Sequence, residues 1–282
     1  MQVYNNANLN QKHRNGVIAI GNFDGIHLGH QKVINEAKNK ARKNKLPFGL
    51  ITFEPVPVMF FDKKIKSHRI NSLKQKKTQL KKLKLDFLII IKFNKKFSSL
   101  TAEKFIKKII HKKTQCRFLY VSENFRFGFK RKGNIKMLKR FEKIFNYKNI
   151  ITKPLTINNK IISSTYIRKR IRDGKINEVN RLLHREWSVE GKVIKGQQRG
   201  RKIGFPTCNL NLNNHVIPKL GVYAVRVKTG NQTNNGIANV GYRPTFKGKS
   251  LFLETNIFGI NKNLYNKVIT VSFKKFIRSE KK

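Results

Sequence analysis

The feature that most constrains the fold is a change in the spacing of apolar residues part-way along the chain. Up to about His184, short apolar runs alternate with longer stretches in which apolar residues recur every three or four positions. Beyond it, short segments alternate apolar and polar residues between glycines and turn residues. The first pattern is typical of β-α-β units around a parallel sheet, and the second of antiparallel strands. Two domains are therefore expected, residues 1–184 and 185–282.

These patterns place the individual elements. Strands of an α/β, Rossmann-like sheet are expected at residues 17–20, 48–53, 87–93, 118–121 and 149–152. Helices are expected at residues 30–44, 71–83, 102–111, 135–145, 165–172 and 176–183. Ser72 and Gln75 have the spacing of a capping box at the start of one helix. Strands of a small antiparallel β-barrel or sandwich, of which we favour the barrel, are expected at residues 188–194, 221–227, 251–258 and 268–273.

The composition bears on whether the protein binds nucleic acid or membranes. Lys and Arg number 63 against 14 Asp and Glu, a formal net charge of +49, which attracts polyanions such as ATP at low salt. The basic residues are spread over the chain, so solvated surface lysines are the simplest interpretation, and no nucleic-acid-binding motif is present. The longest purely apolar run, residues 87–91, is far too short to span a membrane. We expect a soluble globular protein that binds neither membranes nor a specific nucleic acid.

The cysteines give no sign of a metal or disulfide framework. Cys116 and Cys208 lie far apart, with no CxxC or Cys/His spacing around either. A reducing cytoplasm fits this usage.

A segment rich in polar and glycine residues joins the first expected strand to the first expected helix. It reads Asn22-Phe23-Asp24-Gly25-Ile26-His27-Leu28-Gly29-His30. At this place in an α/β sheet the helix offers free N–H groups and a positive dipole end to phosphates. Gly25 and Gly29 permit tight turns, and two imidazoles can donate hydrogen bonds to developing charge. Taken alone, the HxGH letters are equally compatible with two ordinary surface histidines.

Two later segments offer more polar groups to an anion. They are Asn124-Phe125-Arg126-Phe127-Gly128 and Ile162-Ser163-Ser164-Thr165-Tyr166-Ile167-Arg168. Ser164 and Thr165 stand where a helix begins, so hydroxyls and free N–H groups converge, and Arg168 lies one turn inward.

The most specific stretch lies beyond the expected domain boundary. Residues 191–210 read Gly-Lys-Val-Ile-Lys-Gly-Gln-Gln-Arg-Gly-Arg-Lys-Ile-Gly-Phe-Pro-Thr-Cys-Asn-Leu, followed later by Gly221-Val222-Tyr223-Ala224-Val225 and by residues 239–246. Glu254 then interrupts an apolar strand-like alternation, where a solvated acid is unexpected; a salt bridge to a lysine is the alternative interpretation.

From Gly16 onward, these segments are similar to those of the bacterial bifunctional riboflavin kinase/FAD synthetase family. Residues 21–30, 124–128 and 162–168 resemble its cytidylyltransferase-like nucleotidyltransferase domain, and residues 191–210 resemble its riboflavin kinase signature, Gly-Phe-Pro-Thr-Ala-Asn at the core. The resemblance implies that the chain phosphorylates riboflavin to FMN and adenylylates FMN to FAD. ATP would be the co-substrate and Mg²⁺ the cofactor. The implied partners are small molecules, and an oligomer is left open.

The resemblance also implies roles for individual residues. His27 and His30 would bind the ATP phosphates and stabilise the departing pyrophosphate, and Glu254 would be the catalytic base of the kinase. Thr207 and Asn209 would help to bind Mg²⁺. Nucleotide or phosphate binding is implied for Asn22, Phe23, Asp24, Gly25, Gly29, Asn124, Ser163, Ser164, Thr165, Arg168, Gly196, Arg199, Gly200, Gly204, Pro206 and Tyr223.

The sequence departs from the family pattern in several places. Val56 replaces the His of a Pro-His-Pro segment, Cys208 replaces an Ala, and Asn256 replaces a common His. Asn263 and Asn266 replace an Asp and a Gly, and the family's C-terminal helix is not expected after residue 281. Two alternatives therefore stay open: an enzyme that keeps only one of the two activities, or a basic nucleic-acid-binding protein on this scaffold.

Overall fold

The structure, a computed structural model, describes residues 1–195, 206–212, 215–245, 248–260 and 263–280, without the side chains of residues 243–250. The chain forms two compact units, which are described separately. The first unit comprises Met1–Ile65 and Lys77–Ile162, and the second comprises Lys66–Lys76 and Ser163–Lys282. The expected division at residue 184 falls within the second unit and remains a prediction.

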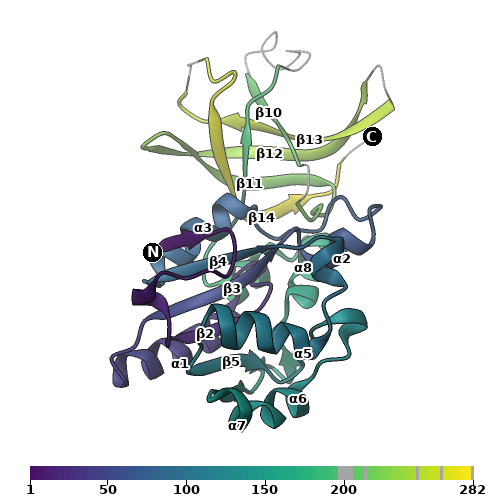
Figure 1. Cartoon of the computed structure of the whole chain (residues 1–282). Helices are drawn as coiled ribbons and strands as arrows, with labels where there is room; N and C mark the ends of the chain where they lie inside the picture. The colour runs from purple at the N-terminus through teal and green to yellow at the C-terminus, as the bar shows by residue number, and fades with distance from the viewer. Residues whose placement is uncertain (196–205, 213–214, 246–247, 261–262, 281–282) are drawn as a thin grey trace. The chain divides into compact units, whose positions relative to one another are not determined.

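A six-stranded parallel sheet forms the centre of the first unit (Figure 1). Its order is β1-β4-β3-β2-β5-β6. The strands are β1 (Gln2–Tyr4), β2 (Val17–Ile20), β3 (Phe48–Glu54), β4 (Phe87–Lys92), β5 (Phe118–Ser122) and β6 (Lys148–Thr152). The Rossmann-like prediction is confirmed. β1 was not predicted because three residues carry no periodicity, and it forms by pairing with β4.

Helices surround this sheet; two of the expected helices differ from the prediction, and four short helical segments were not predicted. The helical segments are η1 (Gln11–His13), α1 (Leu28–Lys43), α2 (Pro57–Phe61), α3 (Leu73–Lys82), α4 (Lys95–Ser98), α5 (Ala102–Phe105), η2 (Ile106–Lys113), η3 (Phe129–Arg131), α6 (Ile135–Arg140) and α7 (Glu142–Phe145). The helix expected at 102–111 is α5 continued by the π-helix η2, and the helix expected at 135–145 breaks into α6 and α7 at Phe141. β7 (Thr156–Ile157) and β8 (Lys160–Ile161) form a separate hairpin.

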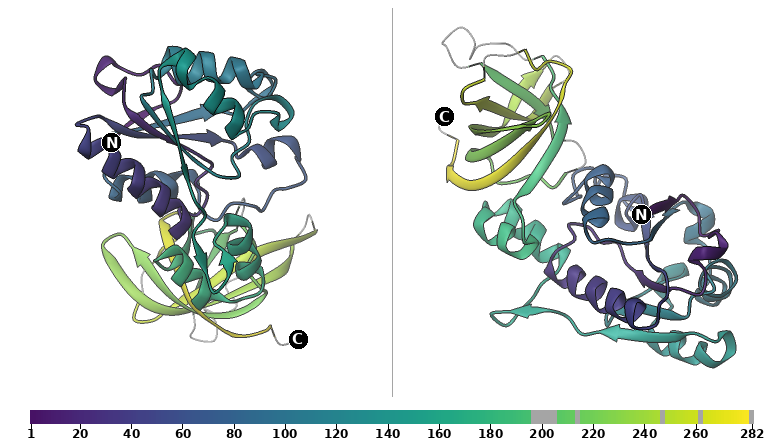
Figure 2. Two further views of the ribbon diagram at one scale, coloured as in Figure 1. Left: turned by 90° about the horizontal axis from the view of Figure 1, so that it is seen from below. Right: turned by 90° about the vertical axis from the view of Figure 1, so that its left-hand side faces the viewer.

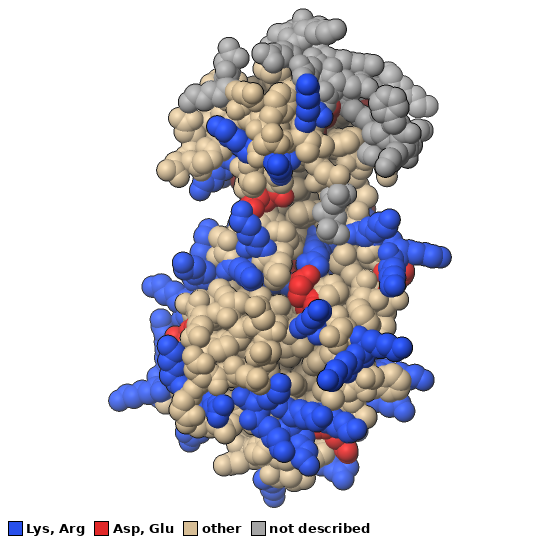
Figure 3. Space-filling view, turned by 45° about the horizontal axis from the view of Figure 1, so that its top comes forward, with Lys and Arg blue, Asp and Glu red and all other residues tan. Residues whose placement is uncertain are grey.

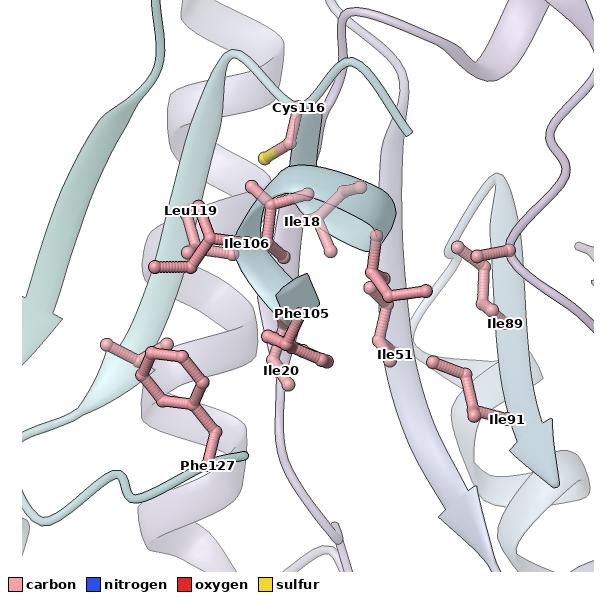
Figure 4. Packing of buried hydrophobic residues seen from close by; sticks show 14 of the residues in the cluster. Ile18, Ile20, Ile51, Ile89, Ile91, Phe105, Ile106, Cys116, Leu119 and Phe127 are labelled. Atoms are coloured by element: carbon pink, nitrogen blue, oxygen red, sulfur yellow. The ribbon is translucent and has the colours of Figure 1, made fainter. Parts of the chain in front are cut away.

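The core of the first unit explains why its strands are almost wholly apolar. Ile18, Ile51 and Ile89 from three neighbouring strands pack with Phe105 and Ile106 of the helical layer, as Figure 4 shows. The opposite face is also covered, because Val33, Ile34, Ala37 and Ala41 of α1 are buried. A parallel sheet buried on both faces requires continuous apolar runs, which is the pattern of β2 and β4.

The second unit carries an antiparallel barrel, which Figure 2 shows curving round on itself. Its elements are α8 (Ser164–Arg172), α9 (Ile176–Leu183), β9 (Trp187–Lys192), β10 (Thr207–Asn211), β11 (Gly221–Thr229), β12 (Gln232–Thr245), β13 (Gly248–Ile257) and β14 (Val268–Arg278). The strand order is β10-β13-β12-β11-β14-β9. A bridge from Ile194 to Asn209 brings the two outer strands together, so the barrel is nearly closed and the predicted fold is confirmed.

The short segment Lys66–Lys76 belongs to the barrel unit through specific hydrogen bonds. Nε1 of Trp187 donates to the carbonyl oxygen of Ile70 at 2.9 Å, and Nε2 of Gln75 donates to the carbonyl oxygen of Ser188 at 2.9 Å. The predicted capping box is present: the backbone N of Gln75 donates to Oγ of Ser72, and the backbone N of Ser72 donates to Oε1 of Gln75.

Candidate active sites

The first candidate site lies where the strand order of the parallel sheet reverses. β2 pairs with β3 on one side and with β5 on the other. The carboxyl ends of β2 and β5 therefore meet at a topological switch point, where open α/β sheets bind ligands. Residues 21–30 follow β2, and Asn124 follows β5. The fold thus brings two predicted segments to adjacent strand ends.

His27 and His30 are held together at the start of α1. His27 is the N-cap residue, and its Nδ1 accepts a hydrogen bond from the backbone N of His30 at 3.3 Å. The two rings stack with their centroids 3.7 Å apart. Because Nδ1 of His27 accepts, a neutral ring would carry its proton on Nε2. Both imidazoles stand at a helix N-terminus, where a phosphate is favoured.

The turn before these histidines is held in an unusual backbone conformation. Phe23, Gly25 and Ile26 all have positive φ, at 46°, 86° and 43°. Such angles are costly for Phe and Ile, and both side chains are buried, so packing holds the turn in place. Oγ1 of Thr52 donates to the carbonyl oxygen of Asn22 at 3.0 Å, which ties the turn to β3.

Asp24 and Gly29 complete this segment. The Asp24 side chain is buried. A Cβ on Gly29 would lie 3.1 Å from the carbonyl oxygen of Ile162 and 3.2 Å from Nδ1 of His27. Residues 23–27 therefore form a buried turn that leads directly into α1, while their contact with a nucleotide stays a prediction.

Asn124 is exposed in the turn that follows β5. Beside it, Phe125 stacks on Phe127 with centroids 5.4 Å apart and 18° between the ring planes. Phe127 is buried and forms a backbone bridge with Gly133. Asn124 thus sits on an anchored turn, and its predicted role in ligand binding is untested.

Sequence reasoning missed a run of phenylalanine rings near the carboxyl ends of β3 and β4. Neighbouring ring centroids lie between 5.3 and 6.2 Å apart. We call this run the aromatic chain; its members are Phe61, Phe60, Phe93, Phe53, Phe97, Phe105, Phe127 and Phe125. Phe61, at one end, is 69% exposed. The abundance of Phe was a signal, but only the strand order shows which rings meet.

The third predicted segment of the nucleotidyltransferase belongs to the second unit. Ser163 is the N-cap of α8, and its Oγ accepts from the backbone N of Tyr166 at 3.1 Å. Ser164 and Thr165 follow in the first helical turn. Arg168 is buried, and its Nε donates to the carbonyl oxygen of His68 at 2.8 Å. The predicted joint action of these residues and the histidines on one triphosphate stays a prediction.

Glu254 and the two predicted metal-binding residues share one face of the barrel wall. β10 and β13 pair Asn209 with Glu254 and Thr207 with Asn256. Directly opposed residues of an antiparallel pair point to the same side. The alternate positions, such as Leu253, are fully buried in the barrel. Thr207, Asn209 and Glu254 therefore lie together on the outer face of the barrel, as the pairing of β10 with β13 requires.

The oxygen donors on this face are chemically compatible with Mg²⁺, whose binding stays a prediction. Thr207 and Asn209 supply neutral oxygens two residues apart, and Glu254 adds a carboxylate. In the part of the chain that the structure describes, no group of three His, Cys, Asp or Glu side chains could hold a metal by itself. Mg²⁺ prefers oxygen ligands and keeps water and phosphate among them, so a sparse protein donor set suits it.

The remaining residues of the barrel unit that were predicted to bind nucleotide differ in burial. Gly196, Arg199, Gly200 and Gly204 lie outside the described residues. Pro206 is exposed, and its carbonyl oxygen accepts from Nδ2 of Asn256 at 2.9 Å. Tyr223 is fully buried, and its hydroxyl donates to the carbonyl oxygen of Lys219. Burial raises the pKa of Tyr223, so this phenol stays a donor. Its predicted contact with a nucleotide is untested.

Two departures from the family pattern have clear structural settings. Val56 is buried as the N-cap of α2. Cys208 pairs with Thr255, whose side chain is fully buried. Burial raises the pKa of the Cys208 thiol, which keeps it protonated and inert. Both residues therefore act as packing groups where they stand.

Across the residues that the structure describes, no helix is both long and apolar enough to cross a membrane. One solved structure is similar to this chain along almost its whole length. The crystal structure of a macrolide-efflux protein from Streptococcus pneumoniae matches with a TM-score of 0.87 and 32% sequence identity. The match covers 99% of this chain and 91% of that chain, so the two share a fold along almost their whole length.

Comparison with protein families and curated relatives covers both parts of the chain. The FAD synthetase family matches residues 9–166, and the riboflavin kinase family matches residues 183–282. The bifunctional riboflavin kinase/FMN adenylyltransferase of Buchnera aphidicola subsp. Schizaphis graminum is 41% identical over 97% of this chain and 89% of its own length. The protein of that name from Escherichia coli K12 is 34% identical over 98% and 88%. The chain therefore belongs to the family of bifunctional riboflavin kinases/FMN adenylyltransferases.

Proposed function

We propose that the chain converts riboflavin to FAD in two ATP-dependent steps at two separate sites. The kinase step transfers the γ-phosphoryl group of ATP to riboflavin and yields FMN and ADP. The adenylylation step joins the AMP part of a second ATP to FMN and yields FAD and pyrophosphate. The observation that carries this division is that His27 and His30 stand at the switch point of one sheet, while Glu254 stands with Asn209 on a separate barrel.

Adenylylation requires charge neutralisation more than proton transfer. The FMN phosphate is already an anion when it attacks the α-phosphorus, so no general base is needed. As the bond to pyrophosphate breaks, negative charge accumulates on the leaving group. His27, through Nε2, and His30 donate hydrogen bonds to that charge at the positive end of α1. In this step Asn124 would help to bind the nucleotide, and residues Ser163–Arg168 would bind its phosphates.

The isoalloxazine ring of FMN binds on the exposed end of the aromatic chain. None of the residues of α2 is buried, and Phe61 leaves most of its ring to solvent. A flat, apolar ligand would cover this ring and extend the series of aromatic contacts, which commonly contribute about 0.5–1.5 kcal/mol each beyond area burial. The phosphate end of FMN would then reach toward the strand ends at the switch point.

Phe61→Ala tests this flavin site. We expect KM for FMN in the adenylylation to rise about ten-fold with little change in kcat, because stacking holds the substrate and not the transition state. Phe129→Ala is the matched control, since Phe129 is another exposed phenylalanine of the first unit, 44% exposed, and is not part of the aromatic chain. An equal rise in both variants would assign the effect to general loss of apolar surface.

The kinase step needs a base because riboflavin presents a neutral alcohol. Glu254 accepts the hydroxyl proton as the oxygen attacks the γ-phosphorus and the bond to ADP breaks. Thr207 and Asn209, on the same face, would hold Mg²⁺ together with the ATP phosphates. The ion would neutralise charge on the β- and γ-phosphates. Because both steps consume ATP, we place them in the cytoplasm, and neither requires a protein or nucleic-acid partner.

The whole proposal is tested by incubating the purified protein with riboflavin and MgATP and separating riboflavin, FMN and FAD. Replacing His27 and His30 together by Ala should abolish FAD formation, so that FMN accumulates as the final product. Glu254→Gln should lower kinase kcat by about two to four orders of magnitude, the usual range for a lost acid/base group, and leave adenylylation of supplied FMN intact. Kinase activity within a few-fold of the original would show that Glu254 is structural, and loss of both activities in one variant would indicate unfolding.

A further inference from the structure

A short segment of the second unit, residues 68–71, accepts a hydrogen bond at each of its four residues. We call it the anchored segment. Its first carbonyl oxygen, that of His68, accepts from Nε of Arg168 in α8 at 2.8 Å. The next carbonyl oxygen, that of Arg69, accepts from the backbone N of Val216 at 2.8 Å. These two donors come from parts of the chain that are far apart in sequence.

The other two residues of the anchored segment contact the start of β9 and the residues before it. The carbonyl oxygen of Ile70 accepts from Nε1 of Trp187 at 2.9 Å. Oδ1 of Asn71 accepts from Nη2 of Arg185 at 2.8 Å. Ile70, Asn71 and Trp187 are buried, and hydrogen bonds away from water are electrostatically stronger. Burial lowers the pKa of Arg185 to about 10, so its guanidinium stays charged at neutral pH and the bond to Asn71 is charge-assisted.

The hydrogen bond to His68 fixes the direction of the Arg168 side chain. A guanidinium group is planar and carries its donors in a rigid fork, so a bond at Nε sets the plane of the whole group. Arg168 is also buried, which limits its alternative conformations. A long side chain that is ordered before its ligand arrives loses less conformational entropy on binding. The anchored segment thus prepares Arg168 to bind an anion.

We propose that the anchored segment positions Arg168 for the ATP triphosphate in the adenylylation step, and that Asn71 and Arg185 hold this segment in place. This inference rests on the phosphate-binding role proposed for Arg168. Asn71 and Arg185 are positioning residues, because they act through the segment and not by contact with ATP. Residues next to the barrel therefore support the adenylylation step and not the kinase step.

The test is steady-state kinetics of both reactions in the full-length protein. In Asn71→Ala, KM for ATP in the adenylylation of supplied FMN should rise about ten-fold with little change in kcat, because a group that holds the triphosphate before and during transfer contributes uniform binding. Asn71→Asp keeps an acceptor oxygen for Arg185 and should stay close to the original KM. KM for ATP in the kinase reaction should be unchanged in both variants.

Arg185→Lys tests the same contact from the other side, so the result does not depend on one variant folding. Nη1 of Arg185 donates to the carbonyl oxygen of Leu183 at 3.0 Å, while Nη2 donates to Asn71. The shorter ammonium group of Lys keeps the charge but not the fork that makes both bonds. This variant should show the same selective rise in KM for ATP as Asn71→Ala.

Asn180→Ala is the matched control. Oδ1 of Asn180 accepts from the backbone N of Trp187 at 2.8 Å, and Nδ2 donates to the carbonyl oxygen of Phe273 at 2.9 Å. Both bonds go to residues outside the anchored segment. This variant should lose stability in thermal unfolding, as Asn71→Ala does, but keep the original KM for ATP in adenylylation. An equal rise of KM in both variants would assign the effect to general loosening of the unit and overturn the inference.

Arg168→Ala separates this inference from the function on which it rests. If that variant adenylylates FMN with the original KM for ATP, the phosphate-binding role fails and the role of the anchored segment fails with it. If Arg168→Ala loses ATP binding while Asn71→Ala and Arg185→Lys keep the original KM, only the inference about the segment is overturned. A rise in both, reversed in Asn71→Asp and absent from the kinase reaction, supports it.

Discussion

At the scale of single residues, one glycine shows how tightly the parallel sheet is packed. Gly49 of β3 lies opposite Phe87 of β4. A Cβ at Gly49 would lie 2.2 Å from Cε2 of Phe87, and that ring is completely buried. The ring of Phe87 therefore occupies the space that any larger side chain at position 49 would need.

Gly49→Ala should be destabilising. Overpacking a close-packed core commonly costs about 1–3 kcal/mol, and the fully enclosed ring places this site at the upper end of that range. Urea unfolding followed by circular dichroism would measure the loss. Adding Phe87→Leu should restore part of the stability, because the smaller side chain vacates the space. A double variant no more stable than Gly49→Ala would show that another contact limits position 49.

Asn149 of β6 is a polar side chain at a buried position where an apolar side chain would be more stable. It is 8% exposed, and neither Oδ1 nor Nδ2 has a hydrogen-bond partner among the described residues. Its backbone N donates to Oε1 of Glu142 at 2.8 Å, a bond that any non-proline side chain preserves. Desolvation of the amide is therefore uncompensated in this structure.

Asn149→Val should accordingly raise the free energy of unfolding by about 1 kcal/mol, because it removes two unsatisfied polar atoms and adds a β-branched residue to a strand. Thermal unfolding by calorimetry would detect this change. Asn149→Asp is the informative comparison, since it should destabilise by burying a charge. A less stable Val variant would mean that a bound water satisfies the amide.

At the scale of elements, sequence periodicity predicted the strands and helices that bury a regular apolar face. β2 and α9 have the predicted bounds, and the capping box at Ser72 forms as expected. β12 was not predicted as a strand, because its residues, rich in Asn and Gly, have weak strand propensity. It forms because β11 and β13 pair with it on both sides, which is tertiary information.

The N-terminal strand and the turn after it should make stability depend on pH. The hydroxyl of Tyr4 pairs with Nδ1 of His13 at 2.8 Å, and the His13 ring stacks on Phe87. Burial, with a further contribution from Lys12, lowers the pKa of His13 below its ordinary 6.5. The unfolded chain therefore binds the proton more tightly than the folded one. Stability should be unaffected above about pH 6.5 and should fall as the pH decreases toward the folded pKa.

Urea unfolding at about pH 7.5 and about pH 5.5 would measure this linkage. The loss of stability at the lower pH should be smaller in His13→Gln, which keeps a polar group but cannot titrate. An identical loss in the variant would assign the acid sensitivity to other groups.

At the scale of the whole molecule, local motifs predict candidate site residues, whose roles stay predictions. Motif residues such as His27 and Glu254 can be recognised from the sequence because each lies in a short segment of characteristic residues. The aromatic chain and the place of Asn239 beside Glu254 depend on strand order and register, which no local pattern encodes. Strand pairing therefore shows which side chains lie near a predicted residue, which a local sequence pattern does not show.

The net charge of +49 is the other property of the whole chain, and it raises the question of nucleic-acid binding. On the face shown in Figure 3, Lys and Arg are spread over the described surface and acidic side chains are few. A dispersed charge attracts polyanions without aligning base-reading groups, so its binding free energy comes mainly from counterion release. Such binding weakens steeply with salt.

The protein should therefore retard a short DNA duplex in a gel at about 50 mM salt and release it at about 200 mM, where a protein with six to ten phosphate contacts loses about 10³–10⁵ in affinity. Retardation should be equal for duplexes of unrelated sequence, because no base is recognised. FMN and FAD formation at the higher salt provides the control that the protein remains folded while DNA dissociates. Retardation that persisted at about 200 mM salt, or that favoured one sequence, would revive the alternative of a nucleic-acid-binding protein on this enzyme scaffold.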